Sequence, residues 1–270
     1  MSDLRTVVIA GAAGRMGQAL LKAVVATEGL CVVGAIERSS SPALGKDVGT
    51  IAGLEPLGIA ITADIGAALE GAEALLDFTT PASSVALAHE TAARGMVHVI
   101  GTTGCSAEDE AAFLAAAEAG ARIVKAGNFS LGVNLLVELT KKAAEVLGPD
   151  WDAEIVEMHH NRKVDAPSGT ALMLGKAIAE GRQTSFKDKT VMAREGHTGP
   201  RQKGTIGFAT LRGGNVIGEH SVYLVGPNER IELTHKAQDR ALFADGAVRA
   251  ALWARNKPKG YYQMADVLGF

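Results

Sequence analysis

The chain of 270 residues is poor in several respects, and each shortage excludes a class of protein. Its two cysteines, Cys31 and Cys105, are too few for a disulfide framework and favour buried thiols in a reducing compartment. Only eight prolines, and glycines without a three-residue period, exclude collagen. A formal net charge of −3 leaves no basic excess with which to bind nucleic acid.

Long apolar runs are also missing. No stretch of 18 or more residues lacks polar or charged side chains, so we expect no membrane span. The first residues, MSDLRTVVIAGAAG, show no basic region followed by a long apolar core. These two features together lead us to expect a cytoplasmic protein.

Glycine and aliphatic residues, by contrast, are plentiful. Hydrophobic residues make up 47% of the chain, which is enough for a sizeable core and too much for a disordered chain. Glycine occupies 32 positions, whereas aromatic residues amount to only 4%. This combination indicates close backbone approaches or tight turns at many points.

Short apolar runs alternate with helical segments over the first 129 residues. Such runs are typical of parallel strands that are buried on both faces. The alternation predicts an α/β fold, a doubly wound, Rossmann-like parallel sheet with helices on both faces. The expected strands are 6–10, 30–36, 74–78, 97–100 and 121–124, and the expected helices are 18–26, 82–94 and 107–119.

From about residue 130 the pattern changes to that of an α+β lobe with a mixed sheet. Beyond residue 190 we expect antiparallel strands, among them a hairpin that joins 205–212 to 216–224 through Gly213-Gly214-Asn215. We therefore predict one domain over 1–129 and a second over 130–239, with the terminal segment 240–270 packing back on the first. The other expected elements are helices at 133–147, 170–180 and 240–255 and strands at 152–158 and 229–237.

A glycine-rich turn lies between the first expected strand and the first expected helix. It reads Gly11-Ala12-Ala13-Gly14-Arg15-Met16-Gly17, so that Ala13 stands where the common G-x-G motif has its second glycine. Glycine permits the tight turn, and the helix N-terminus attracts a pyrophosphate. A turn without a ligand is the alternative, but the position as the first βα turn favours a dinucleotide.

An acidic residue, Glu37, follows this turn by about twenty positions, at the end of the second expected strand. A carboxylate there can accept both hydroxyls of the adenosine ribose, which favours NAD. Its neighbour Arg38 can pair with a 2′-phosphate, assisted by Arg15, although a solvated surface charge is the alternative. The pair predicts that the protein uses both NADH and NADPH.

Three more turns follow strands of the first lobe. Open α/β sheets bind ligands at the carboxyl ends of their strands, where glycine and threonine suit contact with a ribose or a carboxamide. Ordinary turn chemistry explains each of them equally well. The turns are Phe78-Thr79-Thr80-Pro81, Gly101-Thr102-Thr103-Gly104 and Ala126-Gly127-Asn128-Phe129-Ser130.

The segment from Glu154 to Ala171 carries the most chemistry, because a strand leads into a loop with histidines and cations and then into a helix. Ser168 or Gly169 can cap that helix and leave N–H groups free near Thr170 to receive a carboxylate.

Within this segment, His160 and Lys163 supply proton donors, and their like charges lower each other's pKa toward neutrality. A polar surface loop is one alternative. A metal site is another, which is disfavoured because Glu157, His159 and His160 lack the spacing of a helical metal motif.

With these motifs together, the sequence resembles the dihydrodipicolinate (4-hydroxy-tetrahydrodipicolinate) reductase family. The family pattern E-x-x-E-x-H-x-x-x-K-x-D-x-P-S-G-T-A is matched from Glu154 to Ala171. The resemblance runs nearly the full length, through the glycine-rich turn, Asp77-Phe78-Thr79, Asn128-Phe129-Ser130, 194–199, 204–212 and 233–237.

The resemblance implies a reaction of lysine biosynthesis by the diaminopimelate route, in which a reduced nicotinamide gives hydride to a cyclic imine dicarboxylate and water is lost. It places the catalytic residues at His159 and Lys163, both as proton carriers, with substrate binding at His160, Gly169 and Thr170. It implies no metal. The cofactor positions fall on Gly11, Ala12, Ala13, Gly14, Arg15, Met16, Glu37, Arg38, Gly101, Thr102, Thr103, Ala126, Gly127, Asn128 and Phe129.

The family architecture implies that the first domain binds the dinucleotide, and that the second binds substrate and builds a homotetramer by joining sheets. Many members have glycine where this chain has Ala13, and we expect the extra methyl to be tolerated. Two alternatives stay open. One is another two-lobed dehydrogenase, such as a semialdehyde enzyme with Cys105 as nucleophile; the other is a non-catalytic dinucleotide sensor.

Overall fold

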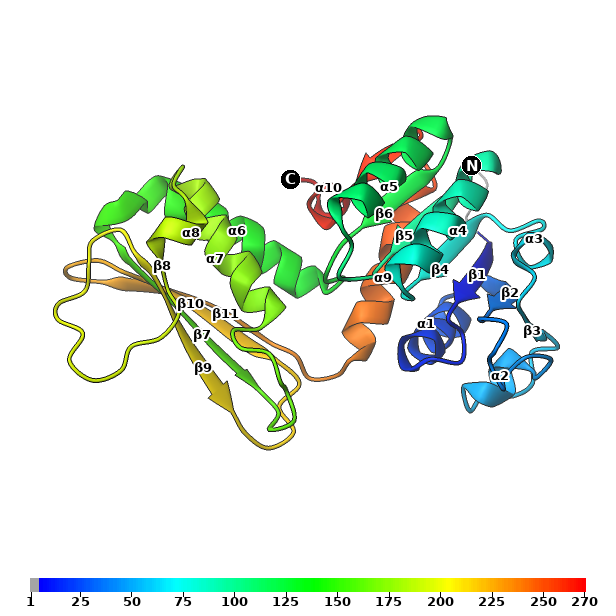
Figure 1. The fold of residues 1–270 in the computed structure, drawn as a ribbon, viewed down its shortest axis with the longest axis horizontal. Helices are drawn as coiled ribbons and strands as arrows, with labels where there is room; N and C mark the ends of the chain where they lie inside the picture. The colour runs from blue at the N-terminus through cyan, green and yellow to red at the C-terminus, as the bar shows by residue number, and fades with distance from the viewer. Residues whose placement is uncertain (1–4) are drawn as a thin grey trace. The chain divides into compact units, whose positions relative to one another are not determined.

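The computed structural model describes residues 5–270, which form two compact units. The first unit contains the described residues up to Ser130 together with Ala241–Phe270, and the second is Leu131–Arg240 (Figure 1). Each unit has its own sheet and its own helices. No helix within residues 5–270 combines the length and the apolar character needed to cross a membrane.

The first unit is built on a seven-stranded sheet in the order β12-β6-β5-β4-β1-β2-β3, in which every pair of neighbours is parallel. The central strands are buried on both faces, as their unbroken apolar runs predict. The doubly wound fold class is confirmed. The strands are β1 (Thr6–Ala10), β2 (Cys31–Ile36), β3 (Ile61–Thr62), β4 (Ala74–Asp77), β5 (Val97–Ile100), β6 (Arg122–Lys125) and β12 (Gly260–Tyr262).

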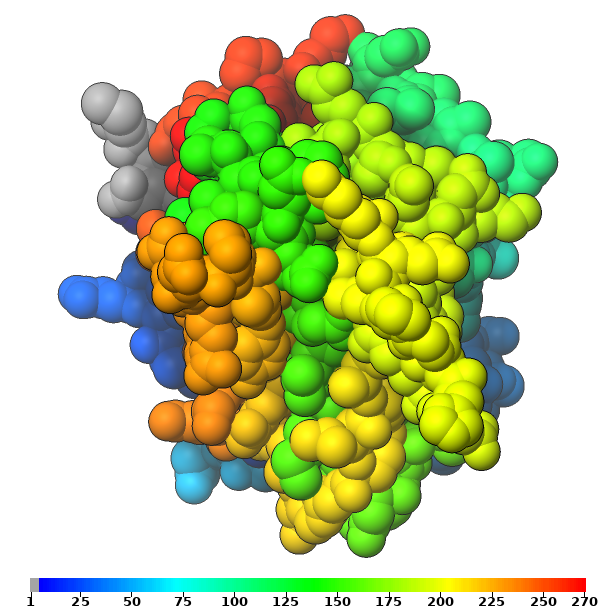
Figure 2. Space-filling model, turned by 90° about the vertical axis from the view of Figure 1, so that its left-hand side faces the viewer, coloured from blue at the N-terminus to red at the C-terminus, as the bar shows by residue number. Residues whose placement is uncertain are grey.

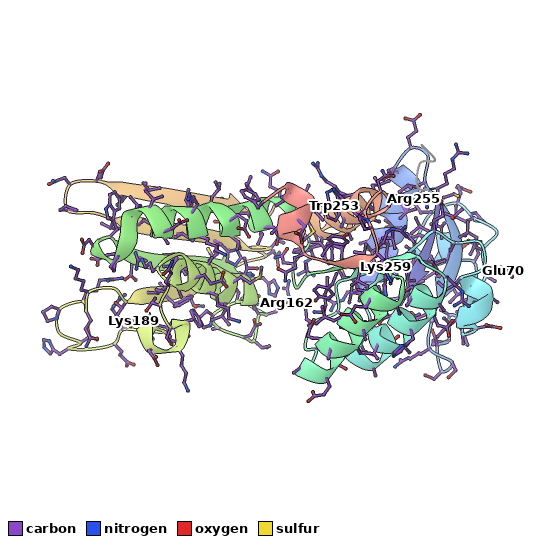
Figure 3. The ribbon with its side chains drawn as sticks, turned by 90° about the horizontal axis from the view of Figure 1, so that it is seen from above. Glu70, Arg162, Lys189, Trp253, Arg255 and Lys259 are labelled. Atoms are coloured by element: carbon purple, nitrogen blue, oxygen red, sulfur yellow. The ribbon has the colours of Figure 1, made fainter. Side chains whose placement is uncertain are left out.

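Helices cover both faces of this sheet. The α4 helix packs against α5 on one face, and α1 packs against α9 on the other, as Figure 3 shows for α4, α5 and α9. The two-residue β3 and the three-residue β12 were not predicted, since strands this short leave no periodic signal. The helices are α1 (Arg15–Ala26), α2 (Val48–Ile51), α3 (Ile65–Ala68), α4 (Pro81–Ala93), α5 (Ala107–Ala119), α9 (Ala241–Ala254) and α10 (Met264–Leu268).

The second unit is a five-stranded mixed sheet in the order β11-β10-β7-β9-β8. Inward-facing side chains of β7 alternate with outward-facing ones, and the inward face forms an apolar core with two long helices, α6 and α7. The elements are α6 (Leu131–Leu147), a 3₁₀ turn η1 (Gly148–Asp150), β7 (Asp152–His159), α7 (Gly169–Gly181), α8 (Phe186–Lys189), β8 (Thr190–Val191), β9 (Ile206–Arg212), β10 (Glu219–Val225) and β11 (Arg230–Lys236).

The predicted hairpin between 205–212 and 216–224 is wrong. β9 runs parallel to β7 on one side, and β10 runs antiparallel to β7 on the other, so that β7 separates the two. The link between them is tied to the end of β7, because Gly213 N–H donates to the His159 carbonyl over 2.9 Å. The residues Gly213-Gly214-Asn215 favour a tight turn locally. The order of the strands depends instead on how the strands pack around the core, which a turn sequence does not show. The actual hairpin joins β10 to β11.

Asp47 organises the loop that follows β2 in the first unit. Its carboxylate accepts backbone N–H groups from Thr50 (2.9 Å), Leu57 (3.1 Å), Gly58 (2.7 Å) and Ile59 (3.1 Å). The Thr50 N–H makes the largest contribution, and together these bonds outweigh partial desolvation and lower the pKa of Asp47 to about 2. The ionised carboxylate therefore holds both ends of this loop.

We predict that Asp47→Ala destabilises the protein at neutral pH and that the loss is pH-dependent. Because the folded pKa lies below the unfolded value of 3.8, the contribution of Asp47 is present above pH 3.8 and is lost as pH falls toward 2. Urea unfolding of the wild type and the variant between pH 6 and pH 3 measures this. Asp64→Ala is the control, because Asp64 caps α3 through the Ala67 N–H (3.0 Å). Equal losses in the two variants would contradict the assignment.

Candidate active site

The glycine-rich turn connects β1 to α1 with the close backbone approach that its sequence predicts. A Cβ atom placed on Gly17 would lie 2.1 Å from the Gly11 carbonyl oxygen and 2.7 Å from the Ala12 Cα, so only glycine fits. Gly14 is the N-cap of α1 and offers no side chain to cap it, and the first turn holds no acidic residue. The first-turn N–H groups are thus left for an anion, and the turn fits a dinucleotide pyrophosphate.

Glu37 and Arg38 lie where the sequence places them, directly after β2. One oxygen of Glu37 accepts the Ala13 N–H over 3.1 Å, and the other accepts the Arg38 N–H over 3.2 Å. The carboxylate therefore also braces the turn next to Ala13. The side chains of Arg15 and Arg38 are both exposed and open to a ligand.

The other predicted cofactor turns meet at the same carboxyl edge of the sheet. Thr102 is buried, and its hydroxyl oxygen accepts the Thr79 N–H over 3.0 Å. Phe129 is buried against the Phe78 ring, with 5.4 Å between centroids, and the Phe78 ring also fills the space that a side chain on Gly101 would need. Sequence reasoning gave Phe78 and Thr79 no specific role, although they connect the turns that it singled out.

The turn after β6 contains Ala126, Gly127 and Asn128. The Asn128 side chain accepts the Ser130 N–H over 2.8 Å. The parallel pairing of β5 with β6 puts this turn beside Gly101, Thr102 and Thr103. All of the predicted cofactor positions therefore belong to turns at one edge of one sheet.

In the second unit, β7 presents Glu157 and His159 on its helix-facing side, two residues apart. The His159 Nδ1 atom lies 2.5 Å from a Glu157 carboxylate oxygen. Both side chains are largely buried, with Glu157 only 1% exposed. Sequence reasoning considered Glu157 only as a metal ligand; the signal it missed is the i, i+2 spacing of a carboxylate and a histidine on one strand.

Glu157 accepts further hydrogen bonds that keep it ionised. Arg212 donates to both of its oxygens (2.9 and 3.0 Å), and the Ser168 N–H donates over 3.1 Å. Burial raises the pKa of Glu157, but the bonds from Arg212 and His159 outweigh it, and the pKa lies below its usual value. An ionised carboxylate only accepts, so His159 Nδ1 carries a proton. The Nε2 atom takes no part in this hydrogen bond.

Lys163 lies in the loop after β7, and its ammonium group contacts both oxygens of Asp165 at 2.7 and 2.8 Å. Arg212, which binds Glu157, also donates to the Asp165 carbonyl over 2.7 Å. One guanidinium group thus connects the strand that carries His159 with the loop that carries Lys163. Sequence reasoning found Lys163 but gave no role to Asp165 or Arg212.

The N-terminus of α7 lies beside these groups. Ser168 caps it, because its hydroxyl accepts the Ala171 N–H over 3.2 Å, and the same hydroxyl lies 2.9 Å from Nε2 of buried His220. Burial, with a contribution from His159, lowers the pKa of His220 to about 4, so this ring is neutral. Gly169 is exposed at the first position of the helix, with open space around it.

His160 follows β7 and is half-buried. Burial lowers its pKa, and the positive charges of Arg162 and Arg240 add to the effect. The direction is the one expected for a histidine in a cationic loop, of which Arg162 is labelled in Figure 3. Within residues 5–270 no three His, Cys, Asp or Glu side chains are grouped so that they could hold a metal ion.

Comparisons with known proteins agree over nearly the whole chain. Family models described as "Dihydrodipicolinate reductase, N-terminus" and "Dihydrodipicolinate reductase, C-terminus" match residues 5–129 and 132–268. The 4-hydroxy-tetrahydrodipicolinate reductase of Brucella abortus (strain 2308) is 59% identical over 263 residues, which cover 97% of this chain and 98% of that protein. Its counterpart in Rhizobium rhizogenes is 58% identical over 268 residues, covering 99% and 97%.

Among solved structures, a dipicolinate-bound dihydrodipicolinate reductase from Paenisporosarcina sp. TG-14 matches with a TM-score of 0.79. The match covers 97% of this chain and 98% of that one, at 23% sequence identity. At this identity the likeness shows the shared fold.

We predict that Gly17→Ala weakens NADH binding by roughly tenfold or more, because the new methyl group must push the Gly11 carbonyl and Ala12 out of the turn. Gly66→Ala is the matched control, since a methyl there meets only the Asp64 carboxylate at 3.4 Å. Fluorescence titration with NADH compares the two variants with the wild type. Unchanged affinity in Gly17→Ala would show that the turn does not contact the dinucleotide.

Proposed function

The chain belongs to the dihydrodipicolinate reductase family, and from this premise we propose how its own residues carry out the reaction. It is an NAD(P)H-dependent oxidoreductase that reduces 4-hydroxy-tetrahydrodipicolinate to tetrahydrodipicolinate with loss of water, in the diaminopimelate route of lysine biosynthesis. The observation that carries the assignment of roles is the buried 2.5 Å contact between Glu157 and His159 Nδ1.

His159 is proposed as a proton donor and acceptor. Because His159 donates its Nδ1 proton to the Glu157 carboxylate, the Nε2 atom is the one that exchanges a proton with the substrate. The carboxylate also stabilises the charged form of the ring whenever Nε2 holds a proton. This arrangement lets one imidazole take up and release a proton on Nε2 while the ring keeps its orientation.

Lys163 is proposed as the second proton donor. Its ammonium group is paired with Asp165, which holds it close to the loop until the substrate arrives. A dianionic substrate competes with Asp165 for this cation. The cyclic imine accepts hydride more readily as its nitrogen gains a proton, and Lys163 is the group proposed to supply that proton.

His160, Gly169 and Thr170 are proposed to bind the substrate carboxylates. The support is the N-terminus of α7, a 13-residue helix whose first residues stand beside the cationic loop. Helix N-termini and cations both favour anions, so the two features act in the same direction. The small size of Gly169 leaves room for a carboxylate to approach the backbone.

The cofactors are NADH and NADPH, and a bound nicotinamide supplies the hydride. We propose that the residues from Gly11 to Met16 hold the pyrophosphate. Glu37 is proposed to bind the adenosine ribose, with Arg38 contacting a 2′-phosphate. The turns at Gly101–Thr103 and Ala126–Phe129 then receive the nicotinamide half, since they lie farther along the same edge.

We also propose that the protein is a cytoplasmic homotetramer that binds neither nucleic acid nor membranes. One face of the second sheet is covered by α6 and α7, and the opposite face carries the outward side chains of β7 and β10, which are only partly exposed. Figure 2 shows β11, in orange, and the 190–205 segment, in yellow, at the surface of this unit. Joining such faces between copies would bury them.

A semialdehyde-type dehydrogenase would need a reactive cysteine, and the properties of Cys105 argue against it. Its thiol is partly buried and lies 3.6 Å from the Thr102 carbonyl, to which it donates. Burial raises the pKa of Cys105, so the reactive thiolate is disfavoured. A dinucleotide sensor is excluded by turnover, which can be measured as NADH consumption with freshly generated 4-hydroxy-tetrahydrodipicolinate.

We predict that Lys163→Ala lowers kcat by roughly 10²–10⁴-fold, which is the usual contribution of a positioned general acid. We expect kcat to fall because the imine nitrogen loses its proton donor, while the cofactor edge stays intact. Steady-state NADH oxidation measures kcat, and Lys176→Ala on the exposed side of α7 is the control. Activity within a few-fold of the wild type would remove Lys163 from the mechanism.

We predict that Glu157→Gln lowers kcat. The amide has one acceptor oxygen fewer and no charge, so it no longer fixes the proton on His159 Nδ1 and the orientation of the ring. The KM for NADH should stay unchanged. Steady-state NADH oxidation measures both quantities. Glu154→Gln is the matched control on the same strand, where the carboxylate faces Arg194 and Arg201. An unchanged kcat would leave Glu157 without a role in proton transfer.

A further inference from the structure

The first unit contains a pair of buried titratable side chains that the proposed reaction does not use. Asp77 ends β4 and His98 lies within β5, and both are 0% exposed. The His98 Nε2 atom lies 3.3 Å from an Asp77 oxygen. Burying two such groups costs free energy, which their hydrogen bonds must offset.

Both ring nitrogens of His98 have a hydrogen-bonding partner. The Thr91 hydroxyl lies 3.0 Å from the Ala88 carbonyl and 3.2 Å from His98 Nδ1. Burial raises the pKa of Asp77, but the bond and the charge of His98 outweigh it, and the pKa is lowered. An ionised Asp77 can only accept, so His98 donates the proton on Nε2 to it.

The other oxygen of Asp77 holds Thr79. It accepts the Thr79 N–H over 3.1 Å and the Thr79 hydroxyl over 2.6 Å. The Thr79 N–H is shared with the Thr102 hydroxyl oxygen, which also accepts the Ser84 hydroxyl over 2.7 Å.

The methyl group of Thr79 reaches the glycine-rich turn as well, because it lies 3.0 Å from the position of a Cβ atom on Gly11. Thr79 thus touches the turn after β1 and the turn after β5 while it belongs to the turn after β4. Whatever fixes Thr79 fixes the spacing of three turns at the carboxyl edge.

We propose that Asp77 and His98 are positioning residues for the dinucleotide: their buried hydrogen-bonded pair locks Thr79 and thereby sets the distance between the Gly11 turn and the Thr102 turn. The inference rests on the proposed cofactor edge. A carboxylate can accept from His98 and twice from Thr79 at once, and the bond from His98 favours its ionised form. A neutral side chain of the same shape offers one acceptor fewer and no charge.

The first test is NADH binding to Asp77→Asn, measured by calorimetry. We expect the Kd to rise about tenfold, because the charge-assisted bonds to Thr79 are lost. Leu87→Ala, a buried change in α4, controls for loss of stability and should bind NADH as the wild type does. Equal binding by Asp77→Asn and the wild type would overturn the proposal. Absence of binding by the wild type would instead overturn the cofactor edge itself.

The second test is a double-mutant cycle with Thr79→Val, which keeps the shape of Thr79 and removes its hydroxyl. If Asp77 acts through Thr79, Asp77→Asn in the Thr79→Val background should cost much less NADH affinity than it does alone. Thr79→Ser, which keeps the hydroxyl, should restore most of the affinity lost in Thr79→Val. Additive losses would contradict the coupling and overturn the proposal.

The third test measures the wild type. Nitrogen NMR reports which ring nitrogen of His98 carries a proton, and His98→Gln serves to assign the signal. A proton on Nε2 at pH 7 supports donation to Asp77. An Nε2 atom without a proton would leave Asp77 without this donor and would overturn the proposal.

Discussion

The architecture of the second unit depends on one buried carboxylate, that of Glu157. A charge removed from water must be met by donors on every side, or it costs several kcal/mol. Glu157 meets this condition with Arg212 from β9, His159 from β7 and the Ser168 N–H at the start of α7. Because each donor comes from a different element, satisfying the carboxylate also fixes the imidazole, the cationic loop and the helix N-terminus relative to each other.

The first unit uses the same physical device at its own sheet edge. There the carboxylate is Asp77, its partner is His98, and the part held in place is the Thr79 turn. In both units an acidic residue near the carboxyl end of a buried strand accepts bonds from a basic side chain and from the backbone of the following turn or helix. Hydrogen bonds from the rigid strands thereby fix the conformation of loops that would otherwise vary. A fixed conformation matters most in loops that contact a ligand.

The sequence was sufficient for the parts of the molecule that follow local rules. Continuous apolar runs predicted the parallel sheet, and the strand–turn–helix order located the turn from Gly11 to Gly17. The segment from His159 to Thr170 was identifiable because its residues are contiguous. Asp165 and Arg212 were missed, because the contact between Arg212 and Glu157 spans 55 residues and leaves no local pattern. The strand β12 was missed because it is short, and three residues are too few to show a periodic pattern.

The wrong hairpin and the missed arginine both concern the neighbours of β7. A turn sequence is local, whereas the choice of neighbouring strand depends on residues far apart in the chain. In the structure β7 lies between β9 and β10, and its parallel register with β9 pairs Glu157 with Thr210 and His159 with Arg212. Arg212 then reaches back to Glu157 and forward to the Asp165 carbonyl. The neighbour of β7, which local turn chemistry could not reveal, thus brings a guanidinium to the carboxylate that contacts His159.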